Sequence, residues 1–242
     1  MPGSAWEGAF MWFYRSRPRT YGTKLRRGQC LAALALAALV FAFAGGARAA
    51  ADRPVKIVVL GDSLSAGLGL PADAAFPARL AQALKAKDIA VSVANAGVSG
   101  DTASGGLGRL DWSVPDGTDA VIVELGANDA LRGIDPKLTK AALDTILNKL
   151  KERYIAVLLA GMEAPRNMGS DYVQAFDAIY PALASSHPVA FYPFFLDGVA
   201  ADPKLNQGDG LHPNAAGVDV IVARMLPQVE ELIARVRAAR GQ

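Results

Sequence analysis

Short apolar segments alternate with longer amphipathic ones along most of the chain, and this alternation constrains the fold more than any other feature. Five short runs are rich in apolar residues and nearly free of charge, which is typical of strands buried on both faces of a parallel sheet. Because strands that alternate with helices predict βαβ units, we expect an α/β fold, a three-layer α/β/α sandwich around a five-stranded parallel sheet. The predicted strands cover residues 55–60, 90–94, 120–125, 155–160 and 189–192, and the predicted helices cover residues 76–87, 136–153, 172–185 and 215–239.

Positive charge is concentrated at the start of the chain. The 242 residues include 25 basic and 23 acidic ones, which gives a formal charge of +2. Residues 1–49 hold seven of the basic residues and one acidic residue, so residues 50–242 carry 18 basic and 22 acidic residues, a net charge of −4. The basic character of the whole chain therefore gives no support to nucleic-acid binding.

Residues 1–49 have the three-part layout of an export signal. Basic residues extend to Arg27, an apolar run covers residues 31–43, and small residues end at Ala49. The run is shorter than the roughly 20 residues that a membrane-spanning helix needs. We therefore expect a signal peptide over residues 1–49, cleaved after about Ala49, and one exported, periplasmic domain over residues 50–242. Retention of the segment as an anchor, and a start at Met11 instead of Met1, stay open.

The only cysteine, Cys30, lies inside this export segment. The domain that follows is therefore free of cysteine, which excludes a disulfide framework and a cysteine-based zinc site. No His/Asp/Glu cluster has the spacing of metal ligands either, so we expect no metal.

Polar residues and glycines follow the ends of four predicted strands. In parallel α/β sheets, ligands bind outside the carboxyl ends of the strands, so a site is expected where these four loops meet. The loops contain residues 61–65, 95–102, 126–129 and 208–213.

Histidine is scarce, and one of the two histidines falls at this edge. A serine nucleophile needs a base near neutral pH, and histidine is the usual one. His187 precedes the last predicted strand, so we interpret it as a surface turn residue at the opposite edge. His212 follows Asp209 by three residues, a spacing at which one tight turn can bring a carboxylate to the imidazole. A plain turn with a capping histidine is the alternative interpretation.

Ser63 follows a predicted strand and should open a helical turn, with its hydroxyl exposed and its amide free. Attack on a carbonyl produces an oxyanion, which needs hydrogen-bond donors placed in advance. The amides of Ser63 and Gly100 and the side-chain amide of Asn128 could supply three. An ordinary strand-to-helix turn and an Asx turn are the alternative explanations. Ser65 stands where the Gly-x-Ser-x-Gly elbow has its second glycine, which argues against an α/β-hydrolase.

Taken together, these blocks resemble the SGNH (GDSL) hydrolases. Gly61-Asp62-Ser63-Leu64 is similar to the first block of that family, Gly100 to the second, Gly126-Ala127-Asn128-Asp129 to the third, and Asp209-Gly210-Leu211-His212 to the fifth. The blocks occur in the family's order over nearly all of residues 50–242. The closest likeness is to the exported bacterial branch of arylesterases, acyl-CoA thioesterases and lysophospholipases.

The resemblance implies a flavodoxin-like fold and hydrolysis of carboxylic esters and thioesters through an acyl-enzyme intermediate, without a cofactor. It implies that Ser63 is the nucleophile, His212 the base and then the acid, and Asp209 the carboxylate that orients it. Ser63, Gly100 and Asn128 would form the oxyanion hole. Residues 129–136 would be a mobile cover over the acyl chain, and the loop over residues 161–169 looks more like that of the arylesterase members.

Other functions stay open at this point. The same residues could remove O-acetyl groups from carbohydrate or cell-wall polymer. A nucleotide-binding module is a further alternative, although the chain lacks the P-loop lysine and the Rossmann glycine spacing. A non-catalytic binding protein is another alternative. The expected partner is a small-molecule ester or thioester, with no nucleic acid and no stable membrane span after cleavage. The sequence predicts neither the oligomeric state nor the physiological substrate and its acyl chain length.

Overall fold

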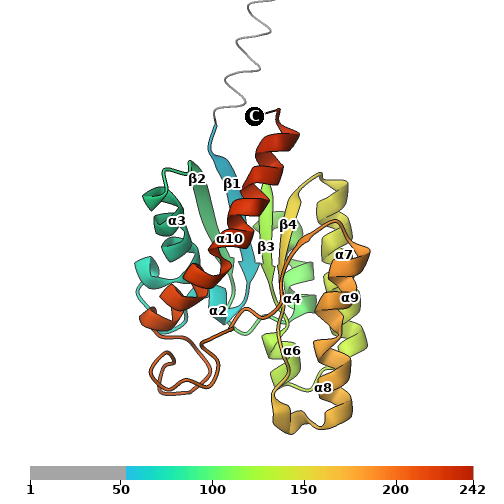
Figure 1. The fold of residues 1–242 in the computed structure, drawn as a ribbon. Coiled ribbons are helices and arrows are strands. Elements are labelled where there is room, and N and C mark those ends of the chain that lie inside the picture. The colour runs from blue at the N-terminus through green and yellow to red at the C-terminus, as the bar shows by residue number, and fades with distance from the viewer. Residues whose placement is uncertain (1–52, 242) are drawn as a thin grey trace, which may run out of the picture. The chain divides into compact units, whose positions relative to one another are not determined.

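A five-stranded parallel sheet forms the middle layer of the computed structural model, which describes residues 53–241 (Figure 1). The strand order is β2-β1-β3-β4-β5. All five predicted strands are present, so the α/β fold expected from the sequence is confirmed. The strands are β1 (Val55–Gly61), β2 (Val91–Gly97), β3 (Ala120–Glu124), β4 (Ala156–Ala160) and β5 (Ala190–Tyr192).

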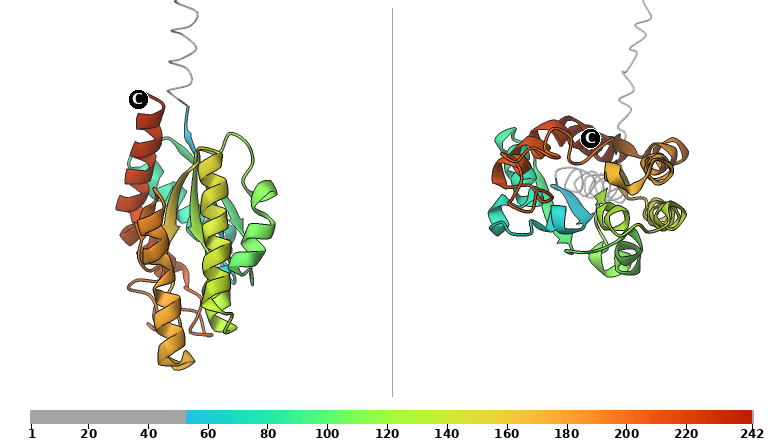
Figure 2. Two further views of the ribbon diagram at one scale, coloured as in Figure 1. Left: turned by 90° about the vertical axis from the view of Figure 1, so that its right-hand side faces the viewer. Right: turned by 90° about the horizontal axis from the view of Figure 1, so that it is seen from below.

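Helices cover both faces of the sheet and complete three layers (Figures 1 and 2). One face carries α3 (Phe76–Ala86) and α10 (Ala215–Ala239), which also pack on each other. The other face carries α4 (Ala103–Gly108), α7 (Pro136–Glu152) and α9 (Ile179–Ser186). The shorter helices are α2 (Ser63–Ala66), α5 (Leu110–Ser113), α6 (Ala127–Leu131) and α8 (Ser170–Asp177), with 3₁₀ turns η1 (Ala72–Ala74) and η2 (Arg166–Met168).

Helix α7 shows how local sequence and packing agree. Asp135 caps its first turn by accepting a hydrogen bond from the Lys137 amide, and Pro136 occupies the first helical position, where a missing N–H costs nothing. One stripe of the helix is buried against the sheet and its neighbours. The stripe contains Ala142, Leu143, Ile146, Leu147 and Leu150.

The predicted helix over residues 172–185 is wrong as a single element. The structure divides this region into α8 and α9, separated at Ala178. Pro181 explains the break, because it has no N–H to donate to the carbonyl of Asp177 and its ring crowds that carbonyl.

The expectation that all strands are buried on both faces fails for β2. None of its residues is fully buried. The strand lies at the edge of the sheet and pairs with β1 alone, so one side of it has no strand to cover it. Its Ser92 and Asn95 are compatible with that exposure.

The register of the sheet brings the strand ends to one level. Gly61 at the end of β1 lies opposite Gly97 of β2 and Glu124 of β3, and Glu124 lies opposite Ala160 of β4. The loops that follow therefore begin side by side at one edge, as the sequence predicted. Within residues 53–241, no helix has both the length and the apolar character needed to span a membrane.

Candidate active site

The turn after β1 presents Ser63 at the start of α2. Asp62 precedes it as the cap of this short helix, and its Oδ1 accepts a hydrogen bond from the Leu64 amide at 2.9 Å. The Ser63 amide donates no hydrogen bond to any residue in the described part of the chain. The turn therefore leaves both the hydroxyl and the amide of Ser63 available to a ligand.

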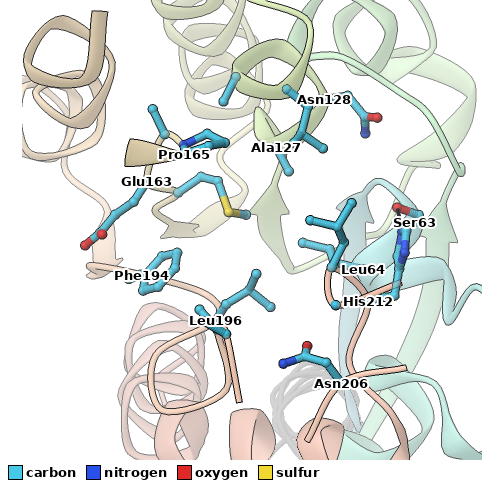
Figure 3. A pocket seen from close by; sticks show the side chains of 18 of the residues that line it. Ser63, Leu64, Ala127, Asn128, Glu163, Pro165, Phe194, Leu196, Asn206 and His212 are labelled. Carbon is cyan, nitrogen blue, oxygen red and sulfur yellow. Dashed lines mark hydrogen bonds between the residues drawn. The ribbon is translucent and has the colours of Figure 1, made fainter. Parts of the chain in front are cut away.

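Ser63, His212 and Asp209 form a hydrogen-bonded line, although Ser63 and His212 are 149 positions apart. Figure 3 shows Ser63 beside His212. Ser63 Oγ lies 2.9 Å from His212 Nε2, and His212 Nδ1 lies 2.6 Å from Asp209 Oδ2. Since a carboxylate only accepts, Nδ1 carries the proton and Nε2 accepts from the serine hydroxyl. This tautomer suits an imidazole that removes a proton from serine.

Asp209 holds its own turn together as well as the imidazole. Its Oδ1 accepts hydrogen bonds from the amides of Leu211, at 2.9 Å, and His212, at 3.0 Å. The pKa of Asp209 lies well below its usual value. The bond from the His212 amide contributes most to this shift, followed by the bond from the Leu211 amide and the hydrogen bond to the imidazole ring. These contacts, together with the exposure of the side chain to water, favour the charged carboxylate.

Gly100 supplies a second free amide. Its φ of +85° lies in the left-handed region, which a residue with a side chain adopts only at a cost. No described residue accepts a hydrogen bond from its amide, while its carbonyl oxygen accepts one from Arg132 at 2.8 Å.

Asn128, in α6, lies between the turn of Ser63 and the loop of Gly100. Its Nδ2 donates to Asp62 Oδ2 at 3.1 Å and to the carbonyl oxygen of Asp101 at 3.0 Å. The site thus brings all five residues predicted from the sequence to one edge. Both N–H groups of Asn128 are occupied in the free site, so donation to a ligand requires it to exchange one of these bonds.

Arg109 joins the loops beneath these groups, and sequence reasoning did not single it out. The guanidinium is buried, and it donates to the carbonyl oxygens of Gly61 at 2.8 Å and Ala96 at 2.7 Å. It also pairs with the carboxylate of Asp101. One side chain therefore connects the ends of β1 and β2 with the loop that carries Gly100.

Two carboxyl groups are buried under the nucleophile turn. Burial raises the pKa of Asp62 to about 6, and burial together with the nearby charge of Asp62 raises the pKa of Glu124 well above its usual value. Glu124 Oε2 accepts hydrogen bonds from Ser65 Oγ at 2.6 Å and from the Asp62 amide at 3.3 Å. The raised pKa favours the protonated form of Glu124, whose hydrogen bonds hold the backbone next to Ser63.

A cavity of about 410 Å³ opens beside Ser63 and His212 (Figure 3). Its size falls in the range of small-molecule sites. The wall is mostly apolar and comes from four parts of the chain: α2, α6, the loop after β4 and the segment between β5 and α10. Its apolar members include Leu64, Ala127, Ala130, Leu131, Met162, Ala164, Pro165, Phe194, Leu196 and Leu211.

The segment over residues 129–136, predicted as a mobile cover, borders this cavity through Ala130 and Leu131. It is attached to the rest of the structure by hydrogen bonds. Tyr172 Oη donates to the carbonyl oxygen of Ile134 at 2.9 Å, and Arg132 donates to that of Gly100. Its mobility remains a prediction.

His187 lies outside the site, as predicted, but it is not a simple surface residue. Its ring is 7% exposed, and its Nε2 contacts Asp144 of α7 at 2.7 Å. In residues 53–241, no three His, Cys, Asp or Glu side chains come together as a metal site would require.

A hydroxyl, an imidazole and a carboxylate in line, at the carboxyl edge of a three-layer α/β/α fold, define a hydrolase of the serine type. The profile of the GDSL-like Lipase/Acylhydrolase family matches residues 59–220, and the chain belongs to this family. It is accordingly a hydrolase that acts on ester bonds.

Named relatives agree with this membership. "Thioesterase 1/protease 1/lysophospholipase L1" of Escherichia coli K12 is 41% identical over 186 residues, which cover 76% of this chain and 86% of that protein. "Arylesterase" of Vibrio mimicus is 40% identical over 166 residues, which cover 68% of this chain and 83% of that protein. Among solved structures, AlinE4, described as an SGNH-hydrolase family esterase, is 43% identical with a TM-score of 0.63, over 74% of this chain and 96% of that one.

Proposed function

We propose that the chain is an esterase and thioesterase in which Ser63 forms an acyl-enzyme intermediate with the substrate. The observation that carries the proposal is the line from Ser63 through His212 to Asp209 beside an apolar cavity. His212 Nε2 accepts the hydroxyl proton as Ser63 Oγ bonds to the carbonyl carbon. Asp209 holds the ring in this tautomer and stabilises its charged form.

The oxyanion formed by this attack would be bound by three donors. The free amides of Ser63 and Gly100 are two of them, and Nδ2 of Asn128 is the third, once it gives up its bond to Asp62 or to Asp101. The intermediate then expels the alcohol or thiol, which takes its proton from His212. Water then attacks the acyl-serine carbonyl as it gives a proton to His212. The bond from that carbon to Ser63 Oγ breaks, the carboxylic acid leaves, and His212 returns the proton to Oγ.

The apolar cavity would hold the acyl group. The thioesterase and arylesterase names of the relatives support carboxylic esters and thioesters as the substrate class. No specific feature of the cavity favours O-acetylated carbohydrate over these substrates. The two classes are separated by a panel of p-nitrophenyl esters of increasing chain length, an acyl-CoA thioester, a lysophospholipid and acetylated sugars.

The same panel with Ser63→Ala as the control tests the proposal itself. Hydrolysis of the esters by the wild-type protein and its loss in Ser63→Ala are the expected result. Hydrolysis by Ser63→Ala at the wild-type rate, or action on acetylated sugars alone, would contradict it.

For the location of the protein, we propose export to the periplasm with cleavage after about Ala49. The basic, apolar and small-residue parts of residues 1–49 support this, and these residues lie outside those that the structure describes. Sequencing the amino terminus of the protein recovered from a periplasmic extract tests it. A terminus near residue 50 is expected, and a full-length chain in the cytoplasmic or membrane fraction would contradict it.

A further inference from the structure

Asn206 is a polar residue of the cavity wall that has no part in the proposed chemistry. Asn206 lies in the segment between β5 and α10, and it is 6% exposed. Its Nδ2 donates hydrogen bonds to the carbonyl oxygens of Val199 at 2.7 Å and Asp202 at 2.8 Å. These bonds fix which end of the amide is nitrogen, because the reverse orientation would place an oxygen against two carbonyls.

The oxygen of the same amide faces the cavity. Figure 3 shows Asn206 projecting from the lower wall, with Oδ1 directed toward the space between Leu64 and Leu196. Among residues 53–241, no group donates a hydrogen bond to this atom. A largely buried residue therefore presents an acceptor with no protein partner to the cavity, in a wall that is otherwise apolar on this side.

The backbone around Asn206 is held in a shape that costs free energy. Ala201 has a φ of +62°, in the left-handed region that residues with a side chain rarely adopt. Ala200 and Ala201 line the cavity, and the two hydrogen bonds from Asn206 enclose them. Such strain persists where surrounding contacts hold it in place. The position of Asn206 Oδ1 is thus determined by the structure around it.

A plain alkyl chain that fills the cavity would remove water from Oδ1 and return no hydrogen bond, and an unpaired buried acceptor is unfavourable. A donor on the chain would remove this penalty. The donor should be neutral, because an ammonium group would lose its hydration in an apolar cavity.

We propose that the cavity is built for acyl chains that carry a hydroxyl group, which donates a hydrogen bond to Oδ1 of Asn206. This inference rests on the proposed function, because it assigns the substrate class of the same site. Sites that hydrogen-bond a substrate hydroxyl discriminate against the analogue that lacks it, since the protein group is then left unpaired.

The test is a set of p-nitrophenyl octanoates with a hydroxyl at carbon 3, 6 or 8, compared with plain octanoate and with the matching methoxy esters. We expect the wild-type protein to prefer at least one hydroxy ester by about tenfold in kcat/KM, the size of one net hydrogen bond in a dehydrated site. The methoxy esters accept but do not donate, so they should show no such preference. Spontaneous hydrolysis and lactone formation are subtracted by means of reactions without enzyme.

Asn206→Leu should abolish the preference for the hydroxy ester. Asn214→Ala is the matched control, because Nδ2 of Asn214 donates to the carbonyl oxygens of Lys204 and Asn206 in the same segment. The preference should persist in the control, even if both variants lose stability or overall rate.

Four results would overturn the inference. Two concern the wild-type protein: no preference for a hydroxy ester, or an equal preference for a methoxy ester. Two concern the variants: a preference that survives in Asn206→Leu, or one that disappears in both Asn206→Leu and Asn214→Ala. If Asn206→Leu does not fold, the comparison of hydroxy, methoxy and plain octanoates with the wild-type protein alone tests the inference. Hydrolysis of octanoate without any hydroxyl preference would contradict this inference and leave the esterase proposal standing, whereas no hydrolysis of any ester would contradict both.

Discussion

Glu124 lies fully buried beneath the nucleophile turn, with Oε2 bonded to Ser65 and to the Asp62 amide. Its Oε1 is buried without a hydrogen-bond partner among the described residues. A carboxylate in this position would be costly, which is why burial and the neighbouring Asp62 raise the pKa of Glu124.

The raised pKa predicts how the stability of the fold depends on pH. The folded protein keeps a proton on Glu124 that the unfolded chain releases above its ordinary pKa, so stability is full below that pKa and falls as the pH rises. Glu124→Gln is neutral at every pH. Its free energy of unfolding should therefore rise relative to the wild type from about pH 5 upward, by up to about 1.4 kcal/mol per pH unit. Urea unfolding of both proteins at pH 5 to 8 measures the difference; a constant difference would contradict the prediction.

Asn128 is the residue for which the predicted role and the free structure differ. Its two N–H groups bind Asp62 and Asp101 in the free site, yet the proposed function requires one of them at the oxyanion. Asn128→Ala should lower kcat by about 10²- to 10³-fold, with a much smaller change in KM, because the bond to the oxyanion forms only in the transition state. Steady-state kinetics with a p-nitrophenyl ester checks this. A rise in KM at unchanged kcat would instead assign Asn128 to substrate binding.

Single residues also show where the sequence stops being informative. The types and spacing of Ser63, Asp209 and His212 predicted that they meet. Glu124 and Asn206 carried no such signal, because a buried carboxyl and a lining amide are recognisable only by their surroundings. Those surroundings come from segments far away along the chain.

At the scale of elements, Arg109 links parts of the fold that position the site. It contacts the ends of β1 and β2 and the loop before α4, and lysine cannot reproduce its planar fork of donors. Arg109→Lys should lower kcat by about tenfold or more with little change in KM, since the geometry of the donors would be disturbed.

Arg153→Lys is the control for that variant. Arg153 donates to the carbonyl oxygen of Val114 and pairs with Asp116, in the connection that precedes β3 and therefore away from the carboxyl ends of the strands. Thermal unfolding and kinetics of both variants separate the two roles. A similar loss of kcat in both would show that Arg109 contributes stability only.

The strands were predictable because each is a short apolar run. The edge position of β2 was not predictable, because strand order depends on pairing between segments far apart in the sequence. Helix α4 was missed for a different reason. Its sequence, Ala-Ser-Gly-Gly-Leu-Gly, has no helical pattern, yet a Cβ on Gly106 would lie 2.3 Å from Cδ1 of Leu125. Glycine is needed there for close packing, and this need outweighs its low helix propensity.

For the whole molecule, we propose residues 50–242 as the folding unit, because residues 53–241 supply a five-stranded sheet, helices on both of its faces and the site. We therefore expect a chain that begins at Ala50 to fold and to hydrolyse esters with the same kcat/KM as the full-length protein. Circular dichroism melting and ester kinetics of the two forms check this. A loss of cooperative unfolding in the shorter chain would contradict the assignment of residues 50–242 as the complete folding unit.

Charge follows the same division. The short chain carries a net charge of −4 and the full chain +2, so the excess of basic residues belongs to the first 49 residues. Attraction of polyanions is thus not expected of the short form. The short chain should pass through a heparin column without retention, both in low-salt buffer and with sodium chloride added. Strong retention of the short chain at low salt would contradict this expectation.

The central claim is that Ser63 is the nucleophile, and covalent labelling tests it most directly. A fluorophosphonate should add one equivalent to the native protein, and peptide mass spectrometry should place the label on Ser63. Asp209→Asn should react more slowly, because its imidazole is no longer held in the required tautomer. A label on any other residue, or stoichiometric labelling of Ser63→Ala, would contradict the account.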